Sequence, residues 1–253
     1  MYARWLLICF LLLPMLAQAK CAEPIRVGVN THWPPYIILT DRAISGTDME
    51  IVALLAASMD ECVEFVRLPS SVRLLTELEA NRVDLVPGAS FTNARLQYGV
   101  YSNTYREEEV RLLINTNSVT GTQTGFEELL ELGKYLVINA GAYYGPQVER
   151  LRTDPRFTKQ IFDVATPIQR YRMLLLDRVD MALEDKYVAM HLKHAYPGSH
   201  IKFHPTVMAT EDVHFLISHS KGTAEFMVRL NRAIDENKEA IAQILEQGYV
   251  VQP

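Results

Sequence analysis

Short apolar runs alternate with amphipathic stretches along the first third of the chain. Segments of four or five mostly apolar residues predict strands, and apolar residues at helical spacing predict helices. The predicted order is strand, helix, strand, helix, strand, over Ile25–Val29, Asp48–Met59, Val63–Val66, Val72–Ala80 and Val83–Val86. Because neighbouring parallel strands need a crossover between them, this order predicts an α/β fold with a parallel sheet.

A polar stretch separates this set from a second one. Val110–Ile114 is a predicted strand, and Asn115–Gly125, rich in Thr, Asn and Gly, follows it. The second set comprises helix Phe126–Leu132, strand Tyr135–Ile138, helices Gly145–Arg152 and Thr166–Leu176, and strand Met181–Leu183. The last predicted elements are strand Val213–Ile217 and helices Ala224–Glu236 and Ala240–Glu246. The chain is therefore predicted to build two similar α/β lobes.

The first 19 residues have the pattern of a secretory signal peptide. Arg4 precedes the apolar run Trp5–Leu13, and Ala17-Gln18-Ala19 forms a small-x-small cleavage site. The run is shorter than the roughly 20 apolar residues of a membrane-spanning helix, and no other stretch reaches that length. We expect cleavage after Ala19 and a soluble mature chain exported to the periplasm.

The mature chain is expected to be acidic. Arg4 leaves with the signal peptide, so the 25 basic residues become 24 against 30 acidic ones, a formal charge of −6. This balance argues against nucleic acid and anionic lipid as partners. The seven histidines show no metal-ligand spacing and the chain has no nucleotide-binding glycine pattern, so we expect no metal and no cofactor.

The segment Gly88–Tyr105 carries the most distinctive chemistry. Gly88 follows a short apolar strand and lets the backbone approach a ligand closely. Ser90 and Thr92 supply hydroxyl groups, and Arg95 supplies a planar set of donors that can bind a carboxylate with two hydrogen bonds. Taken alone, an arginine after a strand more often belongs to a surface ion pair.

The pattern G-x-S-x-T-x-x-R at Gly88–Arg95, followed by Y-S-x-x-Y at Tyr101–Tyr105, resembles the bacterial extracellular solute-binding proteins of family 3. These are amino-acid-type periplasmic receptors of ABC transporters. The resemblance implies a type II periplasmic-binding-protein fold with two lobes, each a mostly parallel sheet flanked by helices, joined by two crossover strands. It also implies that Arg95 holds the α-carboxylate of the ligand.

The same resemblance implies a first lobe made of two separate parts of the chain. With crossings near Ile114 and Val213, we expect residues 20–113 and 211–253 in lobe 1 and residues 114–210 in lobe 2. The closing helices would then pack back on the first lobe. Two crossing strands would let the lobes hinge and close over a ligand.

Two more binding residues follow from matching the family pattern. Trp33, in the loop after the first strand, is expected to form a stacking wall for the ligand; alternatively, Trp33 and Tyr36 are ordinary packing aromatics. Asp185 is expected to bind the α-ammonium group of the ligand. The alternative role of Asp185 is the N-cap of a helix over Lys186–Lys193, and the two roles can coexist.

Two positions depart from the family pattern. Relatives often carry threonines after the glycine that corresponds to Gly141, where this chain has Ala142 and Tyr143. Backbone N–H groups at the following helix start can still bind an anion, so we expect a weakened carboxylate grip, with Tyr143 adding bulk or a phenol to the pocket. Relatives that bind cationic side chains tend to have an acid at Asn30, so Asn30 argues mildly against lysine, arginine or ornithine.

The mature chain is expected to keep two cysteines, Cys21 and Cys62, since Cys9 leaves with the signal peptide. Both precede predicted strands that are parallel neighbours in the family, so the resemblance makes a disulfide plausible. A bridge over about 40 residues would contribute roughly 4 kcal/mol through loop-closure entropy. The alternative is two unpaired thiols.

We therefore expect a monomeric receptor that closes on an amino acid or small carboxylate and delivers it to a membrane permease. A rival from another class is a periplasmic enzyme of the cyclohexadienyl-dehydratase type, which has a similar fold and needs a proton donor such as Glu184 or His32. No Ser/His/Asp arrangement is found, and we expect no enzyme. A third alternative is a ligand sensor without its own permease.

Overall fold

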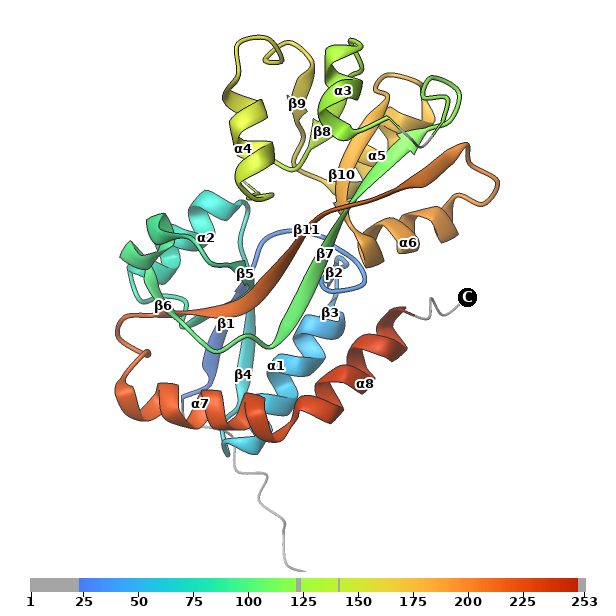
Figure 1. Cartoon of the computed structure of the whole chain (residues 1–253). Coiled ribbons are helices and arrows are strands. Elements are labelled where there is room, and N and C mark those ends of the chain that lie inside the picture. The colour runs from blue at the N-terminus through green and yellow to red at the C-terminus, as the bar shows by residue number, and fades with distance from the viewer. Residues whose placement is uncertain (1–22, 122–123, 141, 250–253) are drawn as a thin grey trace, which may run out of the picture.

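The computed structural model describes residues 23–121, 124–140 and 142–249. Within them the chain forms two α/β lobes joined by two long strands that cross from one lobe to the other (Figure 1). One mixed sheet runs through both lobes in the order β4-β1-β5-β11-β7-β10-β8-β9, with β6 paired to β11. The predicted signal peptide, residues 1–19, lies outside the described residues.

The strands of this sheet are short within the lobes and long at the crossing. They are β1 (Ile25–Val29), β4 (Val63–Arg67), β5 (Leu85–Ser90), β6 (Gly99–Tyr101), β7 (Arg106–Asn115), β8 (Leu136–Ile138), β9 (Ile161–Asp163), β10 (Met181–Asp185) and β11 (Ile201–Ser218). A separate small hairpin is formed by β2 (Ile38–Leu39) and β3 (Ile44–Ser45).

The first lobe begins with three parallel strands. Both β4 and β5 pair in parallel with β1, and helices α1 (Thr47–Ser58) and α2 (Ser71–Glu79) make the crossovers between them. Helix α2 begins after Ser70, whose hydroxyl accepts a hydrogen bond from the Arg73 backbone N–H at 3.2 Å. The predicted strand and helix order of this part is confirmed. The predicted turn at Gly88–Ser90 instead forms the end of β5.

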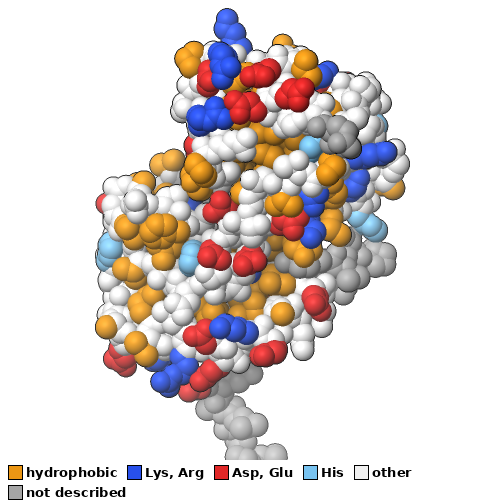
Figure 2. Space-filling model, in the orientation of Figure 1, with side chains coloured by type: hydrophobic (Ala, Val, Ile, Leu, Met, Phe, Trp, Pro, Cys, Tyr) orange, Lys and Arg blue, Asp and Glu red, His pale blue; other side chains and the backbone are white. Residues whose placement is uncertain are grey.

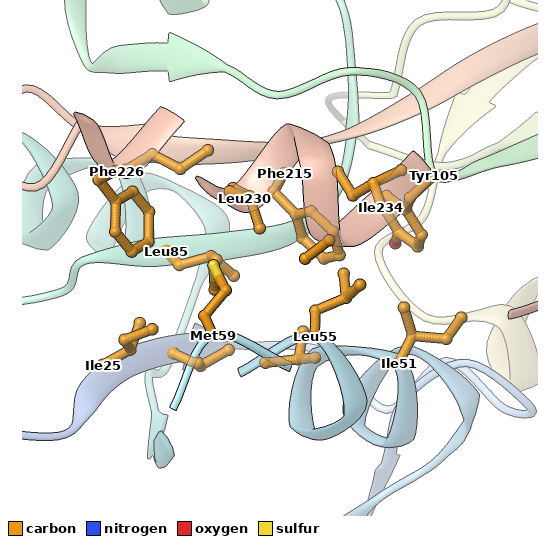
Figure 3. Close-up of a cluster of buried hydrophobic side chains, with 14 of the residues drawn as sticks. Ile25, Ile51, Leu55, Met59, Leu85, Tyr105, Phe215, Phe226, Leu230 and Ile234 are labelled. Carbon is orange, nitrogen blue, oxygen red and sulfur yellow. The ribbon is translucent and has the colours of Figure 1, made fainter. Parts of the chain in front are cut away.

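The apolar core of the first lobe lies between α1, the sheet and helix α7 (Ala224–Glu236). Figure 3 shows Ile51 and Leu55 of α1 facing Phe215 of β11 and Leu230 and Ile234 of α7, and each of these side chains is at most 1% exposed. Full burial of such a side chain contributes about 1.5–3 kcal/mol relative to exposure. Helix α8 (Lys238–Tyr249) also contacts α1, so both closing helices pack on the first lobe, as expected.

The crossing strands β7 and β11 run antiparallel to each other from one lobe to the other. One end of β11 pairs with β5 and β6, and the rest continues along β7 into the second lobe. The apolar pattern predicted a strand only at Val213–Ile217, which was too short. Residues 201–212 were missed because they mix polar residues and Pro205 with few apolar positions.

The second lobe continues the same sheet. Strand β10 is antiparallel to β7 and parallel to β8, which pairs in parallel with β9. Its helices are α3 (Phe126–Glu131), α4 (Pro146–Thr153), α5 (Pro167–Leu175) and α6 (Lys186–Ala195). Strand β9 was not predicted, because Ile161–Asp163 is only three residues long and partly exposed.

An apolar cluster continues from one lobe into the other. Tyr36 and Met49 of the first lobe belong to the same cluster of buried side chains as Leu113 and Leu192, which lie on the second-lobe side. Leu245 of α8 packs against both this shared cluster and the core of the first lobe. The lobes therefore touch through side chains as well as through β7 and β11.

Cys62, just before β4, is disulfide-bonded. Its carbonyl accepts a hydrogen bond from the Ile25 N–H at 2.8 Å, so it lies beside the start of β1. The predicted partner, Cys21, lies outside the described residues, and the pairing of Cys21 with Cys62 stays a prediction.

Gly46 precedes α1 in a backbone conformation that strongly favours glycine, with φ 115° and ψ 169°. An added Cβ would lie 2.3 Å from the Tyr36 carbonyl oxygen. We expect Gly46→Ala to lower the free energy of unfolding by about 2 kcal/mol or slightly more in urea denaturation. Gly125, the N-cap of α3, has φ −68° and open space around an added Cβ, so Gly125→Ala is the control. Equal losses in the two variants would contradict this reasoning.

Candidate functional site

A buried arginine lies where β7 leaves the first lobe. The side chain of Arg106, the first residue of β7, is fully buried. Its Nε and Nη2 donate to the two carboxylate oxygens of Asp48 at 2.9 and 3.2 Å, and its Nη1 lies 3.0 Å from Glu108 Oε1. Its guanidinium carbon lies 3.8 Å from the centre of the Tyr36 ring and 5.8 Å from that of Trp33. Ion pairs and aromatic faces thus fix Arg106 in place.

Gly88 lies directly beside the pair of Arg106 and Asp48. Its φ of 71° falls in the left-handed region that favours glycine. A Cβ added there would lie 3.6 Å from Asp48 Oδ2, 3.8 Å from Arg106 Nη2 and 3.9 Å from Trp33 Cζ3. The close approach at Gly88 is therefore made to groups of the chain itself, and a ligand contact there stays a prediction.

The turn after β5 holds Arg95, the residue that is predicted to bind the carboxylate of a ligand. Arg95 lies in a short 3-10 helix, Asn93–Gln97, and its Nη1 donates to the Ser90 carbonyl at 2.8 Å. The Tyr101 hydroxyl donates to the same carbonyl at 3.2 Å and accepts from the Thr92 N–H at 3.2 Å. Among the residues that the structure describes, Arg95 has no carboxylate partner. Within the described chain, Arg95 therefore does not form the surface ion pair that was the alternative to carboxylate binding.

Asp185 ends β10 and caps α6. Its Oδ1 accepts hydrogen bonds from the N–H groups of Tyr187 and Val188 at 2.8 and 3.0 Å, so the predicted N-cap role is confirmed. Its Oδ2 is buried and has no hydrogen-bond partner in the described chain. Burial raises the pKa of Asp185 to about 6 against the lowering effects of the Val188 N–H and Arg106, and Glu184 adds to the rise. Its predicted role towards a ligand ammonium stays a prediction.

Contact between the lobes at this site is made by Trp33 and Glu184. Arg170 donates to Glu184 Oε2 from Nε at 3.0 Å and from Nη2 at 2.5 Å, and the side chains of this pair are 2% and 5% exposed. Trp33 Nε1 donates to Glu184 Oε1 at 3.4 Å, and its ring centre lies 5.1 Å from that of Tyr36. The packing role of Trp33 is thus visible, and its stacking on a ligand stays a prediction.

Two predicted residues lie apart from these groups. Asn30 Nδ2 donates to Thr31 Oγ1 and to Ser71 Oγ at 2.9 Å each, so it contacts the start of α2. Tyr143 is partly exposed, and the preceding Gly141 lies outside the described residues. The predicted pocket roles of Asn30 and Tyr143 remain predictions.

An acidic side chain, that of Glu211, lies near the start of α4. The backbone N–H groups at this helix start were expected to bind an anion. A Cβ added at Gly145, the N-cap of α4, would lie 3.7 Å from Glu211 Oε1. A carboxylate near a helix N-terminus interacts favourably with the helix dipole. Glu211 therefore lies near the helix start that was expected to bind an anion, and anion binding there stays a prediction.

Four residues of this site were not predicted from the sequence: Arg106, Asp48, Glu108 and Arg170. Arg106 and Glu108 belong to the run Arg106-Glu107-Glu108-Glu109, which looks like a solvated charged segment. The alternation of side chains along a strand could have indicated that this run has one buried and one exposed face, because Arg106 is buried while Glu107 is exposed.

A groove of about 630 Å³ at the crossing strands is lined by Phe91, Glu107, Thr210, Glu211, Asp212 and His214. Figure 2 shows acidic side chains along this junction of the lobes. Glu107 alternates with Arg106 and Glu108 along β7, so its side chain lies on the opposite face of the strand from the candidate site. The described residues hold no cluster of metal-ligating side chains and no helix long and apolar enough to cross a membrane.

Comparison with known families gives a match over most of the chain. The model of the bacterial extracellular solute-binding proteins, family 3, matches residues 25–249. A search of curated proteins found no match.

Solved structures with the same fold cover nearly the whole chain. A histidine kinase sensor domain with similarity to periplasmic binding proteins has a TM-score of 0.75 at 17% identity, over 91% of this chain and 98% of that one. The arginine-, lysine-, histidine-binding protein ArtJ from Geobacillus stearothermophilus has a TM-score of 0.73 at 18% identity, over 91% and 97%. An ancestral amino-acid-binding protein, a precursor of cyclohexadienyl dehydratase, has a TM-score of 0.71 at 19% identity, over 89% and 95%. At these identities the likeness establishes the two-lobed fold of type II periplasmic binding proteins.

Proposed function

The chain belongs to the bacterial extracellular solute-binding proteins of family 3, and from this premise we propose that it is a receptor that closes on an amino acid or small carboxylate. The proposal places the ligand between the lobes, beside Trp33 and Gly88. It further holds that the mature chain acts as a monomer in the periplasm and hands its ligand to a membrane permease.

One observation carries the proposal: each lobe holds one charged group, of opposite sign, that has no oppositely charged side chain as an ion-pair partner within the described chain. On the first lobe, Arg95 has no carboxylate partner within the described chain. On the second, Asp185 Oδ2 is buried without a hydrogen bond there. A zwitterion offers a carboxylate to the first and an ammonium to the second, and both contacts are charge-assisted.

The sheet register gives the spacing of the two strand positions from which these groups extend, one at Ser90 and one at Asp185. Ser90 and Arg106 both pair with Val213, and Asp185 pairs with Val110, four residues further along β7. At 3.3 Å per residue, the row of paired residues that contains Ser90 and the row that contains Asp185 lie about 13 Å apart along the strands. Arg95 follows the Ser90 row and Asp185 lies in the Val110 row, so a ligand that contacts both would lie across the junction of the lobes.

The enzyme alternative needs a proton donor in the site. Glu184 accepts two hydrogen bonds from Arg170 on one oxygen and one from Trp33 on the other. An acid engaged in this way with a cation is a structural ion pair, which favours binding over catalysis. The other candidate, His32, is exposed, and its Nδ1 accepts a hydrogen bond from the Leu39 N–H at 3.0 Å.

A thermal-shift screen of amino acids and organic acids tests the proposed function. A ligand at about 100 times its dissociation constant should raise the free energy of unfolding by about 2.7 kcal/mol, because it binds only the folded state. The ligand should be recovered unchanged after incubation. Conversion of prephenate or arogenate would instead support the dehydratase alternative, and a screen with no stabilising compound would count against the receptor.

A further inference from the structure

Three buried carboxylates and a fourth, Glu108, whose side chain is 12% exposed, share two buried guanidinium groups at the junction of the lobes. Asp48 and Glu108 lie on Arg106, and Glu184 lies on Arg170. Asp185 has no basic side chain within ion-pair distance in the described chain. All four acids together exceed the two arginines by two negative charges. Because a buried charge without compensation is costly, the site needs a further cation.

The excess charge belongs to Glu108 and Asp185. Asp48 takes both strong hydrogen bonds from Arg106, whereas Glu108 has only the 3.0 Å contact with Nη1, which lacks the angle of a hydrogen bond. Asp185 is 3% exposed. Its Oδ1 accepts hydrogen bonds from the backbone of α6, and its Oδ2 has no hydrogen-bond partner in the described residues. These are the two carboxylates of the site that the chain leaves least compensated.

The sheet register brings Glu108 and Asp185 together. Asp185 is paired with Val110 in the antiparallel ladder of β10 and β7, and Glu108 is two residues before Val110 on the same face. Such diagonal neighbours have Cα atoms about 7–8 Å apart, within reach of long side chains. Glu211 of β11 is directly opposite Glu108, which adds a third acid to the same region.

We infer that Glu108 and Asp185 form one cation subsite, which a proton occupies in the ligand-free cleft and an ammonium group of the ligand occupies in the complex. The exchange balances as one proton released to solvent for each ammonium bound. The inference rests on the proposed receptor function, in which Asp185 already faces the ligand ammonium, and adds to it the hinge-strand residue Glu108 and the exchange of a proton.

The electrostatics of the pair agree with this geometry. Burial raises the pKa of Glu108 to about 7, Arg106 opposes the rise, and Asp185 adds to it. Around the pair lie Asp48 of α1, Arg106 of β7, Glu184 of β10, Glu211 of β11, Arg170 of α5 and Tyr144 before α4. Burial also raises the pKa of the Tyr144 phenol, so this group stays neutral at ordinary pH.

The sign of the pH effect follows from these directions. Both carboxyl groups have pKa values above their ordinary range in the folded chain, about 7 and about 6. At these two groups the folded state therefore binds protons more tightly than the unfolded state. Their contribution to the free energy of unfolding is fully present below about pH 4 and is lost as the pH rises to about 7.

The first arm of the test uses the ligand-free chain. Between pH 5.5 and pH 8 we expect the melting temperature of Glu108→Gln, relative to that of the parent, to rise by about 3–5 °C, since the variant lacks the titrating group. Glu107→Gln is the matched control, because Glu107 is the adjacent, exposed acid on the other face of β7, and it should follow the parent. A parallel pH dependence of parent and Glu108→Gln would overturn the proton half of the inference.

The second arm uses three probes with one carbon skeleton: 2-aminobutyrate, butylamine and butyrate. In calorimetry at pH 6.5, in two buffers of different ionisation enthalpy, a bound amine should release about one proton, and the release should fall towards zero above pH 8. Glu108→Gln should weaken amine binding at least about tenfold and lose most of the proton release. Glu107→Gln should do neither.

The outcomes separate this inference from the receptor proposal. Amine binding without proton release, or equal amine affinity in Glu108→Gln and the parent, would overturn the cation subsite and leave the receptor standing. The same holds if butyrate binds and neither amine does. If no probe and no compound of the wider screen binds, the receptor proposal and the ammonium half of this inference both fall.

Discussion

Replacing Arg106 by methionine is expected to lower the free energy of unfolding by about 3–5 kcal/mol at pH 7.5. The variant keeps much of the volume but removes the cation that compensates Asp48 and Glu108, and leaving buried charge without a partner is among the most destabilising single changes. Urea denaturation followed by circular dichroism measures the loss, and the loss should shrink at pH 5.5, where Glu108 carries a proton.

Arg26→Met is the matched control for this variant. Arg26 also pairs with one aspartate, Asp84, at 2.7 Å, but its side chain is 39% exposed. Solvent screens such a pair, so its loss should cost about 1 kcal/mol or less. A cost for Arg106→Met no greater than that of Arg26→Met would show that the buried cluster does not depend on this guanidinium.

Arg95→Ala is expected to weaken binding of the ligand identified by the screen by about 30-fold or more. Truncating one partner of a charge-assisted contact in a closed cleft costs about 2–5 kcal/mol, and each 1.4 kcal/mol is a factor of ten in affinity. The affinity is measured by calorimetry. The melting temperature of the ligand-free variant should stay near that of the parent, because within the described residues the side chain makes one hydrogen bond, to the Ser90 carbonyl.

Arg42→Ala serves as the control for Arg95→Ala. Arg42 is exposed, and within the described chain its side chain has no ion pair. Unchanged affinity in Arg95→Ala would remove the carboxylate assignment. A loss confined to Arg95→Ala would support it, and a similar loss in both variants would point to a general effect of surface charge.

Much of the fold follows from local pattern. The strands of the first lobe were predictable because most of their residues are apolar; in β1 four of five residues are buried, and β4 keeps Val63, Phe65 and Val66 although it is only partly buried. The extent of β11 was not predictable, because half of it lies between the lobes and pairs with β7 through residues that have no apolar alternation. Backbone pairing rather than side-chain burial holds that half in place.

The site was predicted unevenly for a similar reason. Arg95 and Asp185 could be singled out from the sequence because each follows a short apolar strand in a recognisable motif, and their roles towards a ligand stay predictions. Arg106 and Glu108 were not, since their burial depends on the arrival of α1 and β10 from distant parts of the chain. A charged residue in a charged run is buried only when tertiary contacts compensate it, and those contacts are not visible in local sequence.

The apolar cluster shared by both lobes has a consequence for the rate of capture. Any outward swing of the lobes would expose Tyr36, Met49, Leu113 and Leu192 to water, at about 25 cal/mol for each square ångström uncovered. In the receptor proposed above, this cost makes open molecules the minority of the population, and only open molecules admit the ligand. The observed association rate should therefore fall below the usual diffusional range in proportion to that minority, and it should rise when one of these side chains is shortened.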